Sequence, residues 1–389
     1  MFSIAAARRI RYNSAMNLPK HMPALDGLRG VAVLMVLLTH AGRGLPGAMS
    51  IYSDTASWPK TFALPFWFHR ITDSAEHGVQ LFFVISAFTL TLRVTENSKH
   101  IAGYALRRIS RVGPAYWLAG LGYTLLAGLA PRLWAPAGIA PADLVIAGGF
   151  LNSWMGGASL AVVPGGWSVA CEVAFYIALP LLIWAIDGRI WRVVALTALC
   201  TVVVEVQFYN AIITGTWDFA AAVNPLQQAP VFLCGITAAL VAMRFRMPYL
   251  PGIVATLLLL ATVNLPQTNW QSSAYLESHL AFAGLVAAAV ALSAAYPMPV
   301  LSGRILGKIG EVSYSMYLLH FVLLAPSLRM AEMLIPGNRW PTMLLHFAIT
   351  ALATFIGACI TYRVIERPAI DWAASRTRRV SADATVPAE

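Results

Sequence analysis

Apolar segments of membrane-spanning length recur along the whole chain and constrain its fold more than any other feature. We place ten of them at residues 28–43, 78–95, 111–130, 168–187, 191–209, 226–243, 249–263, 278–296, 312–329 and 341–362. A helix needs about 20 apolar residues to cross the hydrocarbon core of a bilayer, and it satisfies its own backbone hydrogen bonds there. The chain is only 11% charged, whereas soluble domains are about 25% charged. The sequence therefore predicts an all-α polytopic membrane protein with about ten transmembrane helices, embedded in a lipid bilayer.

Positive charges decide how a shorter apolar segment at residues 142–156 is placed. If this segment does not cross the membrane, both termini lie on one side, and that side carries 21 of the 27 Lys and Arg residues. If the segment crosses, the two sides carry 12 and 15 of these residues. Lys and Arg are enriched in cytoplasmic loops. We therefore predict ten crossings, both termini in the cytoplasm, and a re-entrant or interfacial segment near 142–156. The net charge of +10 is then explained by these loops, so no nucleic-acid partner is expected.

The chain divides into three parts by composition. We expect residues 1–21 to form a cytoplasmic N-terminal segment and residues 22–373 to form one membrane domain. The polar stretch that ends the sequence predicts a disordered cytoplasmic tail over 374–389. The first 24 residues have no sustained apolar core and are not expected to be a cleaved signal peptide. The four cysteines lie in apolar segments without metal-ligand spacing, so no metal site is expected.

The first predicted helix, "LDGLRGVAVLMVLLTHAG", carries Arg29 and His40 eleven positions apart. That spacing separates them by about 16 Å along the axis and rotates them to within roughly 20° of one face. Ionisable residues at membrane depth are functional candidates by default. The alternative for Arg29 is a flanking charge that reaches the headgroups. The alternative for His40 is a histidine that only packs against its neighbours. Together the two residues favour a path through the protein along this face.

Further polar residues enter the membrane on other predicted helices. Ser168 and Glu172 are four apart, hence on one helix face; a Glu that only complements the helix dipole is the alternative. His77 and Ser86 lie along "HGVQLFFVISAFTLTLR" and are candidates to bind substrate or support the site.

Two more groups have both a functional and a structural interpretation. Ser313, Tyr317 and His320 form a polar stripe on one apolar helix, which serves either a site or hydrogen bonding between helices. Arg108 and Arg111 precede another apolar segment. They are either anchors of the topology or a clamp for phosphates, which arginine binds in a bidentate manner.

Six segments, taken in order, resemble the signatures of the acyltransferase 3 family of membrane-bound acyltransferases, and the likeness extends over residues 22–373. They are "LDGLRGVAVLMVLLTH", "GVQLFFVISAF", "RRISRVGPAYW", "WSVACEVAFYIALPLL", "SYSMYLLH" and "IERP". Departures stand at Gln80 and Val173, where members often have an acidic residue, and at Ala87, where they often have glycine.

The resemblance implies an O-acyltransferase of the bacterial inner membrane. It would move an acyl group, usually acetyl, from cytoplasmic acyl-CoA to a hydroxyl of a glycan or another acceptor, with no permanently bound cofactor. His40 would be essential, Arg29, Arg108 and Arg111 would serve the CoA end, and Glu172 would support the centre by orienting His40 or holding its imidazolium.

Two questions stay open at this point. His40 would act as a general base or as a transient acyl carrier. A proton-coupled secondary transporter is the alternative function, although transporters often contain repeated halves and we find no second half that matches the first.

Overall fold

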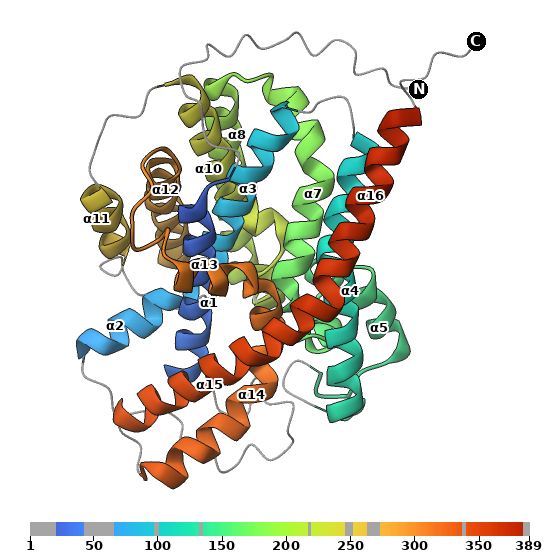
Figure 1. The fold of residues 1–389 in the computed structure, drawn as a ribbon, viewed down its shortest axis with the longest axis vertical. Helices are drawn as coiled ribbons and strands as arrows, with labels where there is room; N and C mark the ends of the chain where they lie inside the picture. The colour runs from blue at the N-terminus through green and yellow to red at the C-terminus, as the bar shows by residue number, and fades with distance from the viewer. Residues whose placement is uncertain are drawn as a thin grey trace.

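The computed structural model describes residues 21–42, 66–96, 101–131, 135–216, 219–245, 252–262, 273–336 and 340–383. Within these ranges the chain is helical and contains no strand (Figure 1). The α-helices are α1 (Pro23–Gly42), α2 (Phe66–Ser74), α3 (Gly78–Glu96), α4 (Ile101–Ala127), α5 (Pro141–Gly148), α6 (Asn152–Met155), α7 (Gly166–Ile186), α8 (Ile190–Ile213), α9 (Phe219–Ala222), α10 (Pro225–Arg244), α11 (Gly252–Thr262), α12 (Ser273–Ala295), α13 (Arg304–Glu311), α14 (Ser313–Leu334), α15 (Trp340–Thr361) and α16 (Arg367–Asp383). Two 3-10 helices, η1 (Ala75–His77) and η2 (Gly157–Ala161), and a π-helix, η3 (Tyr362–Glu366), join them.

Each predicted crossing coincides with a helix of the structure: α1, α3, α4, α7, α8, α10, α11, α12, α14 and α15. In the described part of the chain, seven helices are long and apolar enough to cross a membrane, and these contain α1, α3, α7, α8, α10, α14 and α15. The all-α membrane architecture is therefore confirmed. The count of ten, which also needs α4, α11 and α12, stays a prediction, as does the side on which the termini lie.

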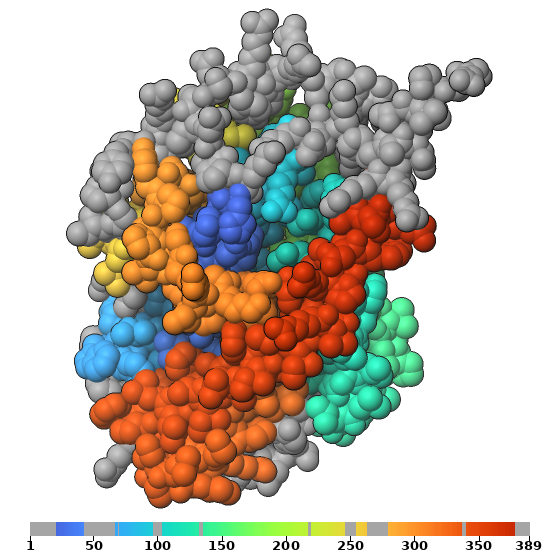
Figure 2. Space-filling model, viewed as in Figure 1, coloured from blue at the N-terminus to red at the C-terminus, as the bar shows by residue number. Residues whose placement is uncertain are grey.

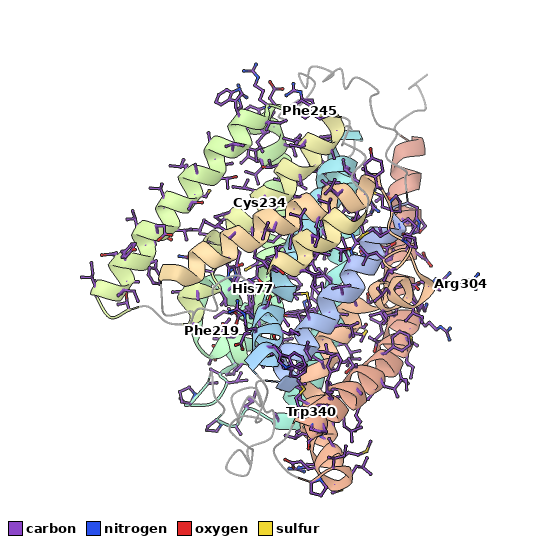
Figure 3. All side chains as sticks on the ribbon, turned by 90° about the vertical axis from the view of Figure 1, so that its left-hand side faces the viewer. His77, Phe219, Cys234, Phe245, Arg304 and Trp340 are labelled. Atoms are coloured by element: carbon purple, nitrogen blue, oxygen red, sulfur yellow. The ribbon has the colours of Figure 1, made fainter. Side chains whose placement is uncertain are left out.

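Most of the long helices run obliquely through the molecule in Figure 3. Phe245 lies near one end of the molecule in this view, and Trp340 lies toward the other. The charge pattern assigns these two residues to opposite sides of the membrane, which is consistent with their places in the figure.

The segment near 142–156 is divided between the short helices α5 and α6, neither of which is long enough to span a bilayer. It reaches the middle of α4: the indole Nε1 of Trp117 donates to the carbonyl of Gly148 at 2.9 Å, and the ring of Phe150 lies 4.9 Å from that of Tyr116. The segment therefore packs against the side of a long helix. Its depth in the membrane stays a prediction.

Helix α1 is central to the bundle, in contact with α3, α12, α13, α14 and α15. Leu28, Val33 and Leu37 are fully buried along it. One glycine of α1 and one of α13 allow the two helices to approach at backbone distance. A Cβ added at Gly30 would lie 2.6 Å from the carbonyl oxygen of Leu306, and one added at Gly310 would clash with the carbonyl of Asp26. The half of α1 that we predict to lie toward the cytoplasm therefore packs directly on the backbone of α13. There is no room for a side chain at Gly30 or Gly310.

Helices α15 and α16 join through the π-helix η3 and cross one face of the molecule as a continuous band, the red diagonal of Figure 2. Glu366, in the π-helix, is only 3% exposed, and it accepts a hydrogen bond from the Ser315 hydroxyl of α14. Helix α16 continues to Asp383, so residues 374–383, which we expected to be disordered, form its last turns. Polarity alone did not reveal that this segment extends a preceding helix. Residues 1–20 and 384–389 of the predicted terminal segments lie outside the described residues.

Candidate active site

A cavity of about 870 Å³, counting the space at its mouth, lies between α1, α3, α4, α7 and α14. Its walls combine aromatic and apolar side chains with a small number of charged and hydroxyl groups. The polar and charged lining residues are Arg29, Ser86, Thr89, Arg93, Arg108, Arg111, Ser168, Glu172, Tyr176, Ser313, Tyr314 and Tyr317.

Four arginines give the cavity its positive charge, and they come from three helices. Arg29 belongs to α1, Arg93 lies near the end of α3, and Arg108 and Arg111 are three residues apart on α4. Asp26 lies one turn before Arg29 and accepts a hydrogen bond from the Arg29 Nη1 at 2.6 Å. This ion pair fixes the Arg29 guanidinium and gives Asp26 a structural role.

Glu172 is the carboxylate in the cavity wall. Its Oε1 accepts a hydrogen bond from the Ser86 hydroxyl of α3 at 2.7 Å. The sequence suggested that Glu172 orients His40, but the structure pairs it with Ser86 and places it among the arginines. Glu172 therefore belongs to the same charged lining as Arg29 and Arg111.

A hydroxyl network lies in the cavity wall, where α7 meets α14. The Tyr317 hydroxyl donates to the carbonyl of Gly165 at 2.8 Å and accepts from the Ser168 hydroxyl at 2.9 Å. Ser168 also lies 3.1 Å from the Gly165 carbonyl. Gly165 has φ +75°, and a Cβ there would lie 2.8 Å from the Tyr317 hydroxyl, so a glycine is needed both for the turn and for the close contact.

His40 and His320 form a pair next to Tyr317. Nε2 of His320 lies 3.2 Å from Nδ1 of His40, and Nδ1 of His320 lies 2.6 Å from the backbone carbonyl oxygen of Tyr317. The ring of Phe321 packs against both imidazoles, with centroids 4.0 Å from His320 and 4.8 Å from His40. Neither histidine is among the residues that line the cavity.

Tyr317 connects the two parts of the site. Its side chain lines the cavity, and the centroid of its ring lies 5.6 Å from that of His320. One aromatic side chain therefore contacts both the cavity and the histidine pair.

His77 lies elsewhere. Its ring packs 4.9 Å from that of His279 and 4.7 Å from that of Phe282. Nε2 of Gln80 lies 2.5 Å from Nε2 of His279, and it also reaches Oε1 of Gln228 at 3.5 Å. This buried polar cluster connects α3, α10 and α12, and it is not part of the cavity lining.

Seven of the ten predicted site residues line the cavity: Arg29, Ser86, Arg108, Arg111, Ser168, Glu172 and Tyr317. Their chemical roles stay predictions. Sequence reasoning missed Arg93, which it counted only as a topological charge, and Tyr176, which lies one turn after Glu172 and packs under the Arg108 guanidinium at 5.9 Å. A polar side chain one helical turn from a candidate carboxylate was the available signal for Tyr176.

Comparisons with known proteins identify the family of this chain. The model of the acyltransferase 3 family, described as an acyltransferase domain, matches residues 22–363. The acyltransferase MdmB of Streptomyces mycarofaciens is 26% identical to this chain over 373 residues, covering 89% of this chain and 91% of MdmB. No solved structure matches the chain. Because the family model covers most of the sequence, this chain belongs to the acyltransferase 3 family.

Proposed function

We propose that the protein is an O-acyltransferase of the bacterial inner membrane. It moves an acyl group, in our proposal acetyl, from cytoplasmic acyl-CoA to a hydroxyl of a cell-surface or exported glycan. The observation that carries the proposal is one cavity lined by four arginines, with a histidine pair next to Tyr317 in its wall.

The charges in the cavity wall indicate where the acyl donor binds. Four arginines and one glutamate line the cavity, which leaves an excess of positive charge for a polyanion. The phosphates of CoA match guanidinium groups, which donate in a planar, bidentate fork. Arg108 and Arg111 hold phosphates, Arg29 serves the same end, and the pantetheine arm extends toward Ser168 and Tyr317.

The transfer end follows from the histidine pair. His40 accepts the proton of the acceptor hydroxyl, and the hydroxyl oxygen attacks the carbonyl carbon of the thioester. The carbon–sulfur bond breaks, and the CoA thiolate leaves with the proton that His40 held. In this proposal the Tyr317 side chain moves aside so that the thioester reaches His40. The Ser168 hydroxyl, released from Tyr317, then stabilises the oxyanion.

The donor site is tested with three variants of neighbouring arginines. Arg108→Gln and Arg111→Gln remove charges from the cavity, whereas Arg107→Gln removes a charge of the same helix that does not line it. Loss of one charged hydrogen bond costs about 1.5–3 kcal/mol, roughly 10- to 150-fold in affinity. We expect acetyl-CoA binding to the purified protein to weaken by this factor in the first two variants only. Unchanged affinity in both would overturn the donor assignment.

The reaction is tested with labelled acetyl-CoA and with cells. Purified protein should transfer or slowly hydrolyse the labelled acetyl group, and cells that carry His40→Ala should lack O-acetyl groups on their glycans, measured by NMR, while the variant still inserts. Glycan acetylation that survives His40→Ala would overturn the proposal. Counterflow of a solute in vesicles without acetyl transfer would indicate the transporter instead.

A further inference from the structure

The hydrogen bonds of the histidine pair determine where the protons are. Nδ1 of His320 faces the backbone carbonyl of Tyr317 at 2.6 Å. A carbonyl oxygen only accepts hydrogen bonds, so this nitrogen has to carry a proton. In a neutral imidazole the other nitrogen, Nε2, then carries the lone pair and acts as an acceptor.

The surroundings of His320 favour its neutral form. The side chain is fully buried, and it packs against the rings of Tyr317, Phe321 and His40. A charge buried among aromatic groups is costly unless a counter-ion pairs with it. Nε2 of His320 is therefore the acceptor that faces Nδ1 of His40 at 3.2 Å, and the bond between them requires the proton to be on His40 Nδ1.

We infer that His320 is a positioning residue: it holds neutral His40 in the Nδ1–H tautomer and thereby assigns Nε2 as the nitrogen of His40 that takes part in the reaction. The participation of His40 in a reaction rests on the proposed function. The tautomer itself is a property of the resting protein. Phe321, which touches both rings, limits their rotation and keeps the two nitrogens facing each other.

The assignment gives the proton a defined path. Nε2 of His40 takes the proton of the acceptor hydroxyl, and Nδ1–H continues to donate to His320 during this step. The same Nε2 then gives its proton to the departing CoA thiolate, so His40 returns to its starting tautomer and no proton is gained or lost by the pair. His320 thus does for His40 what a carboxylate does for the histidine of a catalytic triad, but with a neutral acceptor, which stabilises the imidazolium less and makes it a better proton donor.

The tautomer is tested directly by NMR of protein labelled with ¹⁵N-histidine. The His40 signals are assigned by their loss in a His40→Gln variant. We expect wild-type His40 to show a protonated Nδ1 and an unprotonated Nε2, and His320→Leu to shift the proton toward a mixture of both tautomers. A protonated Nε2 and bare Nδ1 in the wild type would overturn the inference, whatever the activity of the protein.

The positioning role is tested by kinetics with three variants. His320→Leu removes the acceptor, and we expect kcat to fall by about 10²- to 10⁴-fold, the usual contribution of a positioned base, with the KM for acyl-CoA unchanged. His320→Gln supplies an amide oxygen for Nδ1–H and should recover part of kcat. The control is His346→Gln, which removes a buried histidine that bonds the Leu324 carbonyl at 3.0 Å and should leave kcat unchanged.

The outcomes separate this inference from the proposed function. An active wild type whose kcat is unaffected by His320→Leu overturns the positioning role alone. A wild type without acyl transfer overturns the proposed function, while the NMR experiment still decides the tautomer.

Discussion

The contact between Ser168 and Tyr317 joins α7 to α14 in the cavity wall, and its strength is predictable. Tyr317→Phe removes a bond to the Gly165 carbonyl at 2.8 Å and one from Ser168 at 2.9 Å. Ser168→Ala removes only the second of these, because the single Ser168 proton that it donates is shared with the Gly165 carbonyl at 3.1 Å. Hydrogen bonds between membrane helices contribute about 0.6 kcal/mol on average and at most about 1.7 kcal/mol. We therefore expect losses of about 1–3 kcal/mol for Tyr317→Phe and about 0.6–1.7 kcal/mol for Ser168→Ala.

The double variant isolates the bond between the two side chains. Because each single variant already breaks that bond, the double variant should cost less than the sum by about 0.6–1.7 kcal/mol. The assay is reversible unfolding in mixed detergent micelles, followed by tryptophan fluorescence. The control cycle combines Ser168→Ala with Tyr314→Phe, whose hydroxyl donates to the Val112 carbonyl instead. Additivity within about 0.3 kcal/mol in the first cycle would refute the reasoning that this bond links α7 and α14.

Three further predictions concern the packing around α1 and α13 and the buried carboxylate of the π-helix. Gly30→Ala should destabilise the protein by about 1–3 kcal/mol through overpacking against the Leu306 carbonyl. Gly307→Ala is the control, because a Cβ there meets nothing within 4 Å, and it should be neutral or stabilise by about 0.5–1 kcal/mol. Equal melting temperatures of the two variants would contradict this. Lys308→Gln should cost only about 0.2–1 kcal/mol, because the pair with Glu311 at 2.6 Å is nearly half exposed. The Lys308 ammonium lowers the pKa of Glu311 from its ordinary value, so the contribution is present above the unfolded pKa of about 4.3 and should fade as the pH falls below it, seen as converging melting temperatures of wild type and variant in acid. Ser315→Ala should cost about 1.5–3 kcal/mol, because it removes a hydrogen bond to buried Glu366; a melting temperature equal to wild type would show that this bond contributes nothing.

Periodicity predicted which residues share a helix face, and it did so well. Arg29 on α1 lines the cavity, and so do Ser313 and Tyr317 of the predicted stripe on α14, but His320 of the same stripe does not. The same spacing placed His40 on the Arg29 face, but His40 does not line the cavity either. Helical spacing therefore did not show which residues of one face reach the cavity.

Partners between helices were not predictable from spacing. Glu172 had an expected partner in His40, yet Ser86 donates to it, and His40 is bonded to His320, 280 positions away. The amphipathic helix α13 was also missed, because an eight-residue helix is shorter than the segments that a search for membrane crossings detects. A polar residue at membrane depth indicates that a partner is needed, but only the packing of the helices selects it.

The π-helix between α15 and α16 has a consequence for how this long helix is interpreted. A π turn accommodates one more residue than an α turn, so the side chains after Glu366 are out of phase with those before Tyr362. The exposed stripe of α15 therefore cannot be extended in register to find the face of α16 that packs on α4. Deleting one residue within Tyr362–Glu366 would restore a regular helix, but it would turn the whole of α16 by about 100° about its axis and withdraw the buried carboxylate from Ser315.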